Sequence, residues 1–168
     1  PLETVLSIDF FERHPQAYWE WFHEIYRPVE PNGAHRALAS LEAAGRLDAV
    51  ITQNIDGLHQ RAGSRTVWEL HGNWERLVCT SCGAVAALAD AVTVDGDPVP
   101  ACPSCTSQMR PDIVMYGEGL DQGVIEAAVT AISRASVLIV AGTSLVVYPA
   151  AGLIDSFSGD HLVPMNAT

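Results

Sequence analysis

The sequence has 168 residues, 48% of them hydrophobic, which suits one domain, or one domain that carries a small insertion. Its 9 Lys and Arg stand against 20 Asp and Glu, so the formal net charge is −11. A charge of this sign argues against a broad phosphate-binding surface, and we expect no nucleic-acid partner. Small molecules and basic peptides are the partners that this charge favours.

The first part of the chain predicts a small apolar helical module. Residues 3–32 are helical in short pieces, and Pro28 and Pro31 end the module. Its aromatic side chains are Phe10, Phe11, Tyr18, Trp19, Trp21, Phe22 and Tyr26. We expect these side chains to line an apolar core rather than a cofactor site.

The next stretch predicts one helix followed by one buried strand. Asn32 is a helix-capping residue, and the helix that it starts runs to Ala43 and closes at Gly45. Residues 47–52, Leu-Asp-Ala-Val-Ile-Thr, then predict a short buried strand. The order of helix, glycine, apolar strand and polar loop is typical of a parallel α/β unit.

Four cysteines form two Cys-x-x-Cys pairs, Cys79 with Cys82 and Cys102 with Cys105, and nineteen residues separate the pairs. This spacing predicts a tetrahedral zinc site with four thiolate ligands. Two disulfides, or four unrelated core thiols, are the alternatives. Because four thiolates leave no coordination position open for water, the predicted zinc is structural rather than catalytic.

The segment after the cysteines returns to the α/β pattern. It predicts a helix over 124–133, a strand over 137–141 and a further helix that starts at Pro149. A last strand is expected over 161–165, where Pro164 removes a backbone donor and favours an edge position or an early end.

Together these elements predict an α/β fold, with a Rossmann-like parallel sheet and helices on both of its faces. Residues 1–73 and 109–168 would form this domain, and 74–108 would be an inserted zinc ribbon. The uncharged run 136–154 is about as long as a membrane span, but the Gly142-Thr143-Ser144 loop interrupts it. We therefore expect no membrane partner and a cytoplasmic location.

Polar loops follow two of the predicted strands, where ligands gather in open parallel sheets. The first loop reads Gln53-Asn54-Ile55-Asp56-Gly57, and its amides and carboxylate can bind ribose hydroxyls and a carboxamide. An ordinary polar turn, in which Asp56 caps the next short helix, is the alternative. The second loop reads Gly142-Thr143-Ser144, where small residues either let the backbone approach a ligand or form a simple turn.

His71 is the candidate general base, because an imidazole accepts a proton near neutral pH. It lies in Glu69-Leu70-His71-Gly72-Asn73, and Gly72 leaves its surroundings open to a substrate. On its own His71 would be assigned a surface or packing role, and the neighbouring motifs single it out. The other histidines keep that ordinary role: His14, His23, His35, His59 and His161.

Five motifs occur together in a fixed order. They are Thr52-Gln53-Asn54-Ile55-Asp56-Gly57-Leu58-His59, Glu69-Leu70-His71-Gly72, the paired Cys-x-x-Cys, Arg110-Pro111-Asp112-Ile113-Val114-Met115-Tyr116-Gly117-Glu118, and Gly142-Thr143-Ser144-Leu145-Val146-Val147-Tyr148-Pro149-Ala150. In this order and spacing the sequence resembles the sirtuin family over nearly its whole length. Sirtuins are NAD-dependent protein-lysine deacylases in which a dinucleotide-binding domain and a small zinc-bearing domain enclose a cleft. The resemblance implies NAD as co-substrate, one structural zinc, and an acyl-lysine protein or peptide as substrate.

The resemblance also implies roles for individual residues, with His71 as the base that deprotonates a ribose hydroxyl. NAD would be bound on the nicotinamide side by Gln53, Asn54 and Asp56, on the phosphate side by Gly142, Thr143 and Ser144, and at the adenine ribose by Asn166. The substrate peptide would lie as an added strand between Val114-Met115-Tyr116-Gly117 and Leu145-Val146-Val147. In the implied reaction the acyl oxygen attacks the ribose carbon as nicotinamide leaves. The products are the free lysine and O-acyl-ADP-ribose.

The sequence departs from the family at both ends. The family's glycine-rich turn, Gly-Ala-Gly-x-Ser, and the Gly-Ile-Pro-Asp-Phe-Arg that follows it do not occur, and Thr168 falls before the family's C-terminal end. We expect these residues alone to lack most of the pyrophosphate site and to be inactive. The alternative function is a catalytically silent zinc-ribbon module that binds acyl-lysine peptides or a protein partner. A zinc-ribbon nucleic-acid binder is disfavoured by the net charge.

Overall fold

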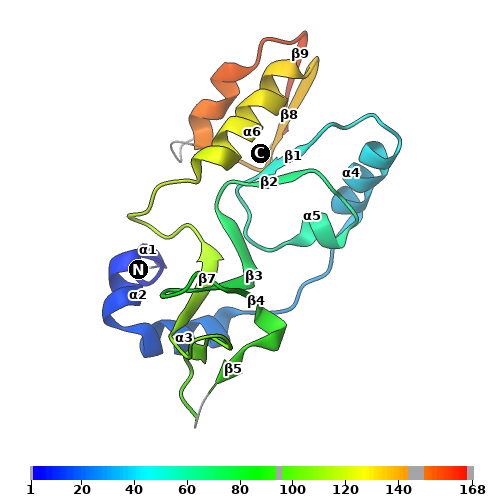
Figure 1. Cartoon of the computed structure of the whole chain (residues 1–168). Coiled ribbons are helices and arrows are strands. Elements are labelled where there is room, and N and C mark those ends of the chain that lie inside the picture. Colours follow the sequence, from blue (N-terminus) through cyan, green and yellow to red (C-terminus); the bar gives the residue numbers. More distant parts are fainter. Residues whose placement is uncertain (1, 94–95, 144–149, 166–168) are drawn as a thin grey trace. The chain divides into compact units, whose positions relative to one another are not determined.

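The computed structural model describes residues 2–93, 96–143 and 150–165 (Figure 1). The chain divides into two compact units, each built from three stretches of sequence. The first unit contains Pro1–Glu30, Asn54–Leu58 and His71–Gly119, and the second contains Pro31–Gln53, His59–Leu70 and Leu120–Thr168. None of the helices in the described ranges is long and apolar enough to cross a membrane.

Three short helices open the first unit: α1 (Leu2–Val5), α2 (Ile8–Arg13) and α3 (Pro15–Ile25). The hydroxyl of Ser7 caps α2 by accepting a hydrogen bond from the Phe10 backbone N–H at 3.2 Å. Pro15 stands at the first turn of α3, where a backbone N–H would have no partner within the helix. The predicted helical pieces are thus confirmed, although the last of them already ends at Ile25.

The aromatic side chains of these helices form the centre of the first unit, as predicted. Phe11, Tyr18, Trp19 and Phe22 are at most 2% exposed, and the rings of Phe11 and Tyr18 pack edge to face at 5.0 Å. The same core continues into the following strands through Leu77, Cys79, Cys102, Met109, Ile113 and Met115. One core therefore joins the helical module to the segment that carries the cysteines.

That segment is built on an antiparallel sheet of three strands in the order β4-β3-β7. The strands are β3 (Gly72–Cys79), β4 (Val85–Ala87) and β7 (Met109–Ile113). Between β4 and β7 in sequence lie the 3₁₀ helix η1 (Leu88–Asp90) and a small pair, β5 (Val92–Thr93) and β6 (Pro100–Ala101). β3 and β7 pair from Gly72 with Ile113 to Cys79 with Met109, with one register shift between Asn73 and Leu77.

The second unit begins with a helix and two parallel strands. α4 (Gly33–Ala43) starts at Asn32, whose side chain accepts from the backbone N–H groups of Ala34 and His35, and Gly45 follows it at φ +67°. The strand β1 (Val50–Thr52) is shorter than predicted. It pairs in parallel with β2 (Val67–Glu69), and α5 (Leu58–Arg61) lies between the two strands in sequence.

One carboxylate ties α4 to the start of β2. Glu42 accepts hydrogen bonds from the backbone N–H groups of Arg65 and Thr66, both at 2.7 Å. These two bonds lower the pKa of Glu42.

The rest of the second unit contains α6 (Gln122–Arg134), β8 (Val137–Ala141), the 3₁₀ helix η2 (Ala150–Ser156) and β9 (His161–Met165). The predicted helix over 124–133 and both predicted strands are confirmed, and the carboxylate of Asp121 caps α6 through the Val124 N–H at 2.9 Å. The helix expected from Pro149 is a 3₁₀ helix rather than an α-helix, and Pro149 itself lies outside the described residues.

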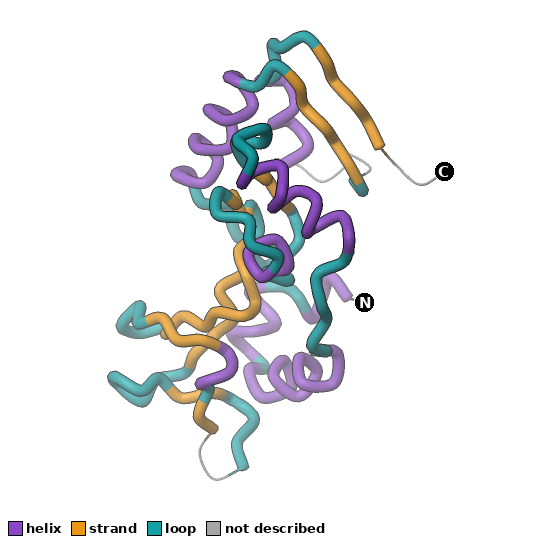
Figure 2. Tube along the Cα trace, turned by 90° about the vertical axis from the view of Figure 1, so that its right-hand side faces the viewer, coloured by secondary structure: helices purple, strands orange, loops and turns teal. Residues whose placement is uncertain are grey.

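Figure 2 shows β8 and β9 side by side, and they pair in parallel along their whole length. Among the described residues, β9 has no second neighbour, in keeping with the edge position predicted from Pro164. Apolar side chains on this pair are exposed, with Ile139 at 53% and Met165 at 56%. In the ranges that the structure describes, the parallel strands form two separate pairs and not one continuous Rossmann-like sheet.

Candidate functional site

The four cysteine sulfurs converge on one point. All four Sγ atoms lie within 4.8 Å of one another, with 3.5 Å from Cys79 to Cys105 and 3.7 Å from Cys82 to Cys102. Zinc–thiolate bonds of about 2.3 Å in a tetrahedron put ligand sulfurs roughly 3.8 Å apart, so the spacing fits one zinc ion. The cysteines are free thiols, and their convergence argues against both disulfides and unrelated core positions.

The turns around these cysteines orient the sulfurs as metal ligands. Backbone N–H groups of Ser81 and Cys82 point at the Cys79 Sγ, and that of Ser104 points at the Cys102 Sγ. Hydrogen bonds from the side chain and backbone of Ser107 lower the pKa of the Cys105 thiol to about 6. The thiolate is the form that binds zinc, so the lowered pKa favours Cys105 as a ligand.

The candidate base His71 directly precedes β3. Its side chain is half-buried, and its backbone carbonyl accepts a hydrogen bond from the Val114 N–H at 2.9 Å. Gly72 has φ +77°, and a Cβ there would lie 2.1 Å from the Asp112 carbonyl oxygen, so only glycine fits. The backbone thereby joins the predicted base to the segment predicted to bind the peptide.

The loop before α5 is attached to the same strand in the first unit. The Trp74 N–H donates to the Ile55 carbonyl at 2.9 Å, and a Cβ on Gly57 would meet the buried Asn73 side chain at 3.0 Å. Asp56 uses one oxygen to cap α5 through the Leu58 N–H at 3.0 Å, which is the ordinary role that its sequence also allowed. Of the predicted NAD residues in this loop, Asn54 is exposed and Asp56 is half-buried.

Three other predicted NAD residues belong to the second unit. Gln53 follows β1, Gly142 and Thr143 follow β8, and the Gln53 amide lies 3.5 Å from the Thr143 hydroxyl. Two carboxyl ends of parallel strands thus bring an amide and a hydroxyl together. The remaining residues predicted to bind NAD or the peptide lie outside the described ranges: Ser144, Leu145, Val146, Val147 and Asn166.

The described half of the predicted peptide site is a short extended segment that ends in a turn. The Tyr116 N–H donates to Leu6, and its carbonyl accepts from Ile8, so α1 and α2 flank it through a parallel bridge at Ser7. The Glu118 N–H donates to the Met115 carbonyl at 3.0 Å, and Gly117 has φ +96°. This is the turn geometry that requires glycine at the third position.

A pair of charged residues in this region was missed by the sequence reasoning. Arg110 Nη1 and Nη2 donate to the two Glu118 carboxylate oxygens at 2.7 and 2.6 Å, and the side chains are only 16% and 26% exposed. Burial raises the Glu118 pKa, but Arg110 and the Met115 N–H outweigh it, so the pKa lies below its usual value. Both residues belong to one of the motifs that carry the family resemblance, and this membership is the sequence signal that could have singled them out.

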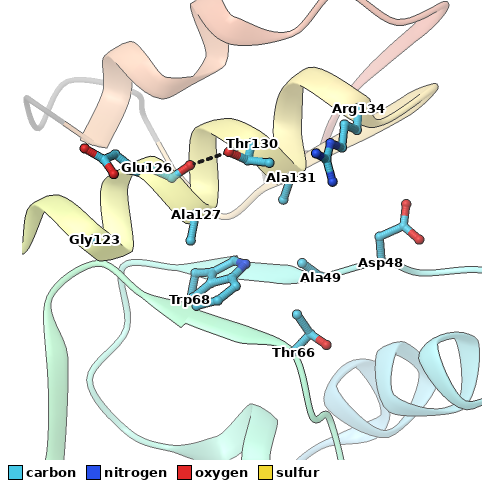
Figure 3. A pocket seen from close by; sticks show the side chains of 10 residues that line it. All are labelled: Asp48, Ala49, Thr66, Trp68, Gly123, Glu126, Ala127, Thr130, Ala131 and Arg134. Atoms are coloured by element: carbon cyan, nitrogen blue, oxygen red, sulfur yellow. Dashed lines mark hydrogen bonds between the residues drawn. The ribbon is translucent and has the colours of Figure 1, made fainter.

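A pocket of about 670 Å³ lies between α6 and the β1–β2 pair, within the second unit (Figure 3). It is lined by Asp48, Ala49, Thr66, Trp68, Gly123, Glu126, Ala127, Thr130, Ala131 and Arg134. None of the predicted zinc, NAD or peptide residues is among them, so we assign this pocket no role in the site.

The family model described as the Sir2 family matches residues 2–149 of the chain. The NAD-dependent protein deacetylase of Clostridium acetobutylicum is 48% identical over 168 residues, which cover 99% of this chain and 68% of that protein. The chain therefore belongs to the Sir2 family, the sirtuins.

Solved structures agree with this membership. A structure of Sir2 bound to acetylated peptide matches 98% of this chain and 72% of its own, at a TM-score of 0.90 and 46% identity. A structure of Sir2 with a p53 peptide and NAD⁺ matches 96% of this chain and 70% of its own, at a TM-score of 0.87 and 47% identity. The chain thus has the sirtuin fold, and its four-cysteine cluster is consistent with a zinc module.

Proposed function

We propose that this protein is an NAD-dependent protein-lysine deacylase, which transfers the acyl group of an acyl-lysine to ADP-ribose with release of nicotinamide. The observation that carries the proposal is the similarity to a deacetylase over 99% of the chain at 48% identity. The four-cysteine cluster, the loops after parallel strands and the histidine before β3 also support the proposal.

His71 is proposed as the general base. A base contributes mainly by accepting a proton at the transition state, so its side chain must be held near the substrate without being fully buried. The half-buried position of His71 and the fixed backbone at Gly72 suit this task.

The NAD-binding residues are proposed from the loops. Gln53, with Asn54 and Asp56, would bind the nicotinamide ribose and carboxamide, because amide and carboxylate groups match hydroxyl and amide partners. Gly142 and Thr143 would face the phosphate side, together with Ser144, while Asn166 would bind the adenine ribose. When bound, NAD supplies the ribose carbon that accepts the acyl oxygen, and nicotinamide is its leaving group.

The substrate peptide is proposed to add as a strand between residues 114–117 and 145–147. Met115 is already bonded to Glu118, and Tyr116 to Leu6 and Ile8, so the peptide would use the remaining backbone groups of the first segment. The acidic net charge would favour basic residues beside the acyl-lysine.

The finer fold assignment is also a proposal. Residues 74–108 would be a zinc ribbon inserted into a Rossmann-like domain of residues 1–73 and 109–168. The parallel pairs β1–β2 and β8–β9, each preceded by a helix, support a sheet of this type. Four free thiols in one metal-binding cluster support a reducing, cytoplasmic location.

The test uses protein expressed from its complete reading frame, an acetyl-lysine peptide and NAD. We expect nicotinamide and deacetylated peptide to appear together by mass spectrometry. His71→Ala should lower the rate by about 100-fold or more, the range typical of a lost general base. The matched control is His161→Ala, because His161 is an exposed histidine on β9. Its rate should stay within twofold of the parent's, since substitutions at exposed positions usually have small effects.

The same experiment distinguishes the deacylase function from the alternative, a catalytically silent zinc-ribbon module. If the protein binds the peptide but neither binds nor consumes NAD, the silent zinc-ribbon module is the better description. Activity of His71→Ala close to that of the parent would contradict the assignment of the base while leaving the deacylase function in place.

A further inference from the structure

Glu118 bonds both backbone groups of Met115. Its carboxylate oxygen Oε2 accepts from the Met115 N–H at 2.8 Å, and its own N–H donates to the Met115 carbonyl at 3.0 Å. Neighbouring residues of an extended segment point their backbone groups to opposite sides. Glu118 therefore binds Met115 on the side of the segment opposite to the one on which Tyr116 binds Leu6 and Ile8.

Arg110 holds this carboxylate in place from strand β7. Besides its two bonds to Glu118, its Nη2 donates to the Ile113 carbonyl at 2.9 Å. The guanidinium lies 5.9 Å from the ring centre of Phe11, which is 2% exposed. Arg110 thus packs against the core of the first unit, and Glu118 connects Arg110 to the turn at Gly117 through its bonds to Met115.

We propose that the Arg110–Glu118 pair is a positioning device that sets the shape of residues 115–117 for the acyl-lysine peptide. The inference rests on the proposed function, because it takes this segment as a peptide-binding one. The pair holds Met115 and the turn from one side, while Leu6 and Ile8 hold Tyr116 from the other. The Tyr116 side chain, 55% exposed, and Gly117 are then presented outward in a fixed conformation.

The chemistry favours ordering of the segment over mere stabilisation of the fold. A bidentate guanidinium–carboxylate pair fixes direction as well as distance, which a single contact does not. Its effect should therefore appear in peptide affinity, because an unordered segment must be ordered on binding. The residues proposed to bind NAD in the second unit, Gln53, Gly142 and Thr143, are not among the partners of the Arg110–Glu118 pair.

The experiment measures two affinities in the protein from its complete reading frame. Binding of a fluorescent acetyl-lysine peptide is followed by anisotropy, and binding of ADP-ribose by calorimetry. Glu118→Gln keeps the side-chain shape but removes the charge, and Arg110→Lys keeps the charge but removes the fork. We expect either change to weaken peptide binding about tenfold or more, as for other lost charge-assisted hydrogen bonds, with ADP-ribose binding within twofold.

A second ion pair, between Arg76 on β3 and Asp112 on β7, provides the matched control. Arg76 Nε lies 2.9 Å from Asp112 Oδ2, and the two side chains are 41% and 43% exposed. Asp112→Asn should leave both affinities unchanged. Zinc content and circular dichroism must match the parent in every variant that is compared.

Three results would overturn the inference. Equal weakening of both ligands would assign the pair a structural role, and unchanged peptide binding in Glu118→Gln and Arg110→Lys would assign it none. Absence of peptide binding in the unsubstituted protein would contradict the proposed function, and the inference with it.

Discussion

The two units of this chain bury their apolar side chains very differently. In the first unit, four aromatic side chains of α2 and α3 are at most 2% exposed and share a core with two of the cysteines. In the second unit, the buried cluster among the described residues has only Leu70 and Ala128 at its centre. On the β8–β9 pair, Ile139 is 53% and Leu162 48% exposed.

This difference separates two ways of making a stable unit. The first unit combines a continuous core with a four-sulfur site, and both act on the same strands. The second unit combines backbone pairing, helix caps and the Glu42 bonds with smaller buried side chains such as Ile132 and Ala151, and it presents apolar strand surface. Exposed apolar surface of this kind marks a place where a further segment or partner packs. We therefore expect the first unit to be the more stable of the two.

The largest effect should follow from losing one zinc ligand. Cys102→Ser removes a ligand that is also 1% exposed in the core. Structural zinc contributes about 10–16 kcal/mol in small zinc-binding peptides, which is comparable to the whole stability of a domain. We expect zinc content near zero by atomic absorption and loss of the folded first unit by tryptophan fluorescence.

The exposed Ser104, in the same turn as Cys102, gives the control for this prediction. Ser104→Ala should keep about one zinc per chain, because its backbone N–H and not its hydroxyl contacts the Cys102 sulfur. Folded parent protein that contains no zinc would rule out the metal site.

The next effect compares the two cores directly. Trp19 is fully buried, and Trp19→Ala should lower the free energy of unfolding by about 3–5 kcal/mol. Ile139→Ala, at a half-exposed position of the second unit, should cost less than about 1 kcal/mol. Urea denaturation measures both changes. Equal losses would contradict the expected dependence of the stability loss on burial.

A smaller effect should appear on acidification. The pKa of Glu118 is lowered in the folded protein, since Arg110 and the Met115 N–H outweigh the opposing effect of burial. A carboxylate with a lowered folded pKa stabilises the protein above its ordinary pKa of 4.5, and this contribution is lost as the pH falls through the folded value.

Glu118→Gln should therefore lower the denaturation midpoint at neutral pH and converge with the parent in acid. Glu42→Gln, in the second unit, should show the same sign, because two backbone N–H groups lower the Glu42 pKa. We expect the Glu118 difference to be the larger, since its charged partner is partly buried. A Glu118→Gln difference that grows in acid would contradict the assigned direction.

The smallest effect concerns the ribbon backbone. Thr106, at φ +63°, is the one non-glycine residue with positive φ in the described ranges. Thr106→Gly should raise the stability by up to about 1 kcal/mol, because a left-handed conformation is strained for a side chain on Cβ. Gly83→Ala, at φ +71°, should lower it by a similar amount. Thermal unfolding of the zinc-loaded protein measures both shifts, and opposite signs would refute the assignment of strain.

Local signals in the sequence were sufficient for the elements and the metal cluster. Asn32 and Gly45 bound α4 as expected, since caps depend on residues a few positions apart. Each Cys-x-x-Cys turn is also a local signal, and the convergence of the two turns was predicted because one zinc ion takes four thiolate ligands. No local pattern marks the Arg110–Glu118 pair. The two residues are eight positions apart, on either side of the end of β7, and their contact depends on how the chain turns between them.

Other features depend on context that local patterns do not carry. The helix expected from Pro149 is 3₁₀, because proline at a first turn specifies where a helix begins and not its hydrogen-bond spacing. The strand predicted over 47–52 is paired only over Val50–Thr52, since pairing depends on the length of its neighbour β2. Asp56 caps α5 by accepting from the Leu58 N–H, and this local hydrogen bond does not indicate whether Asp56 also contacts a carboxamide.

The antiparallel pairing of β3 with β7 has a consequence for protein engineering. Val78 lies opposite Arg110 and Cys79 opposite Met109, so the chain leaves for the ribbon and returns from it at neighbouring positions. A segment whose two ends are adjacent can be exchanged for one of different length without separating its anchors. Chimeras with other sirtuins can therefore be joined at these two positions, provided that Cys79, Cys102 and Met109, which pack in the aromatic core, are kept.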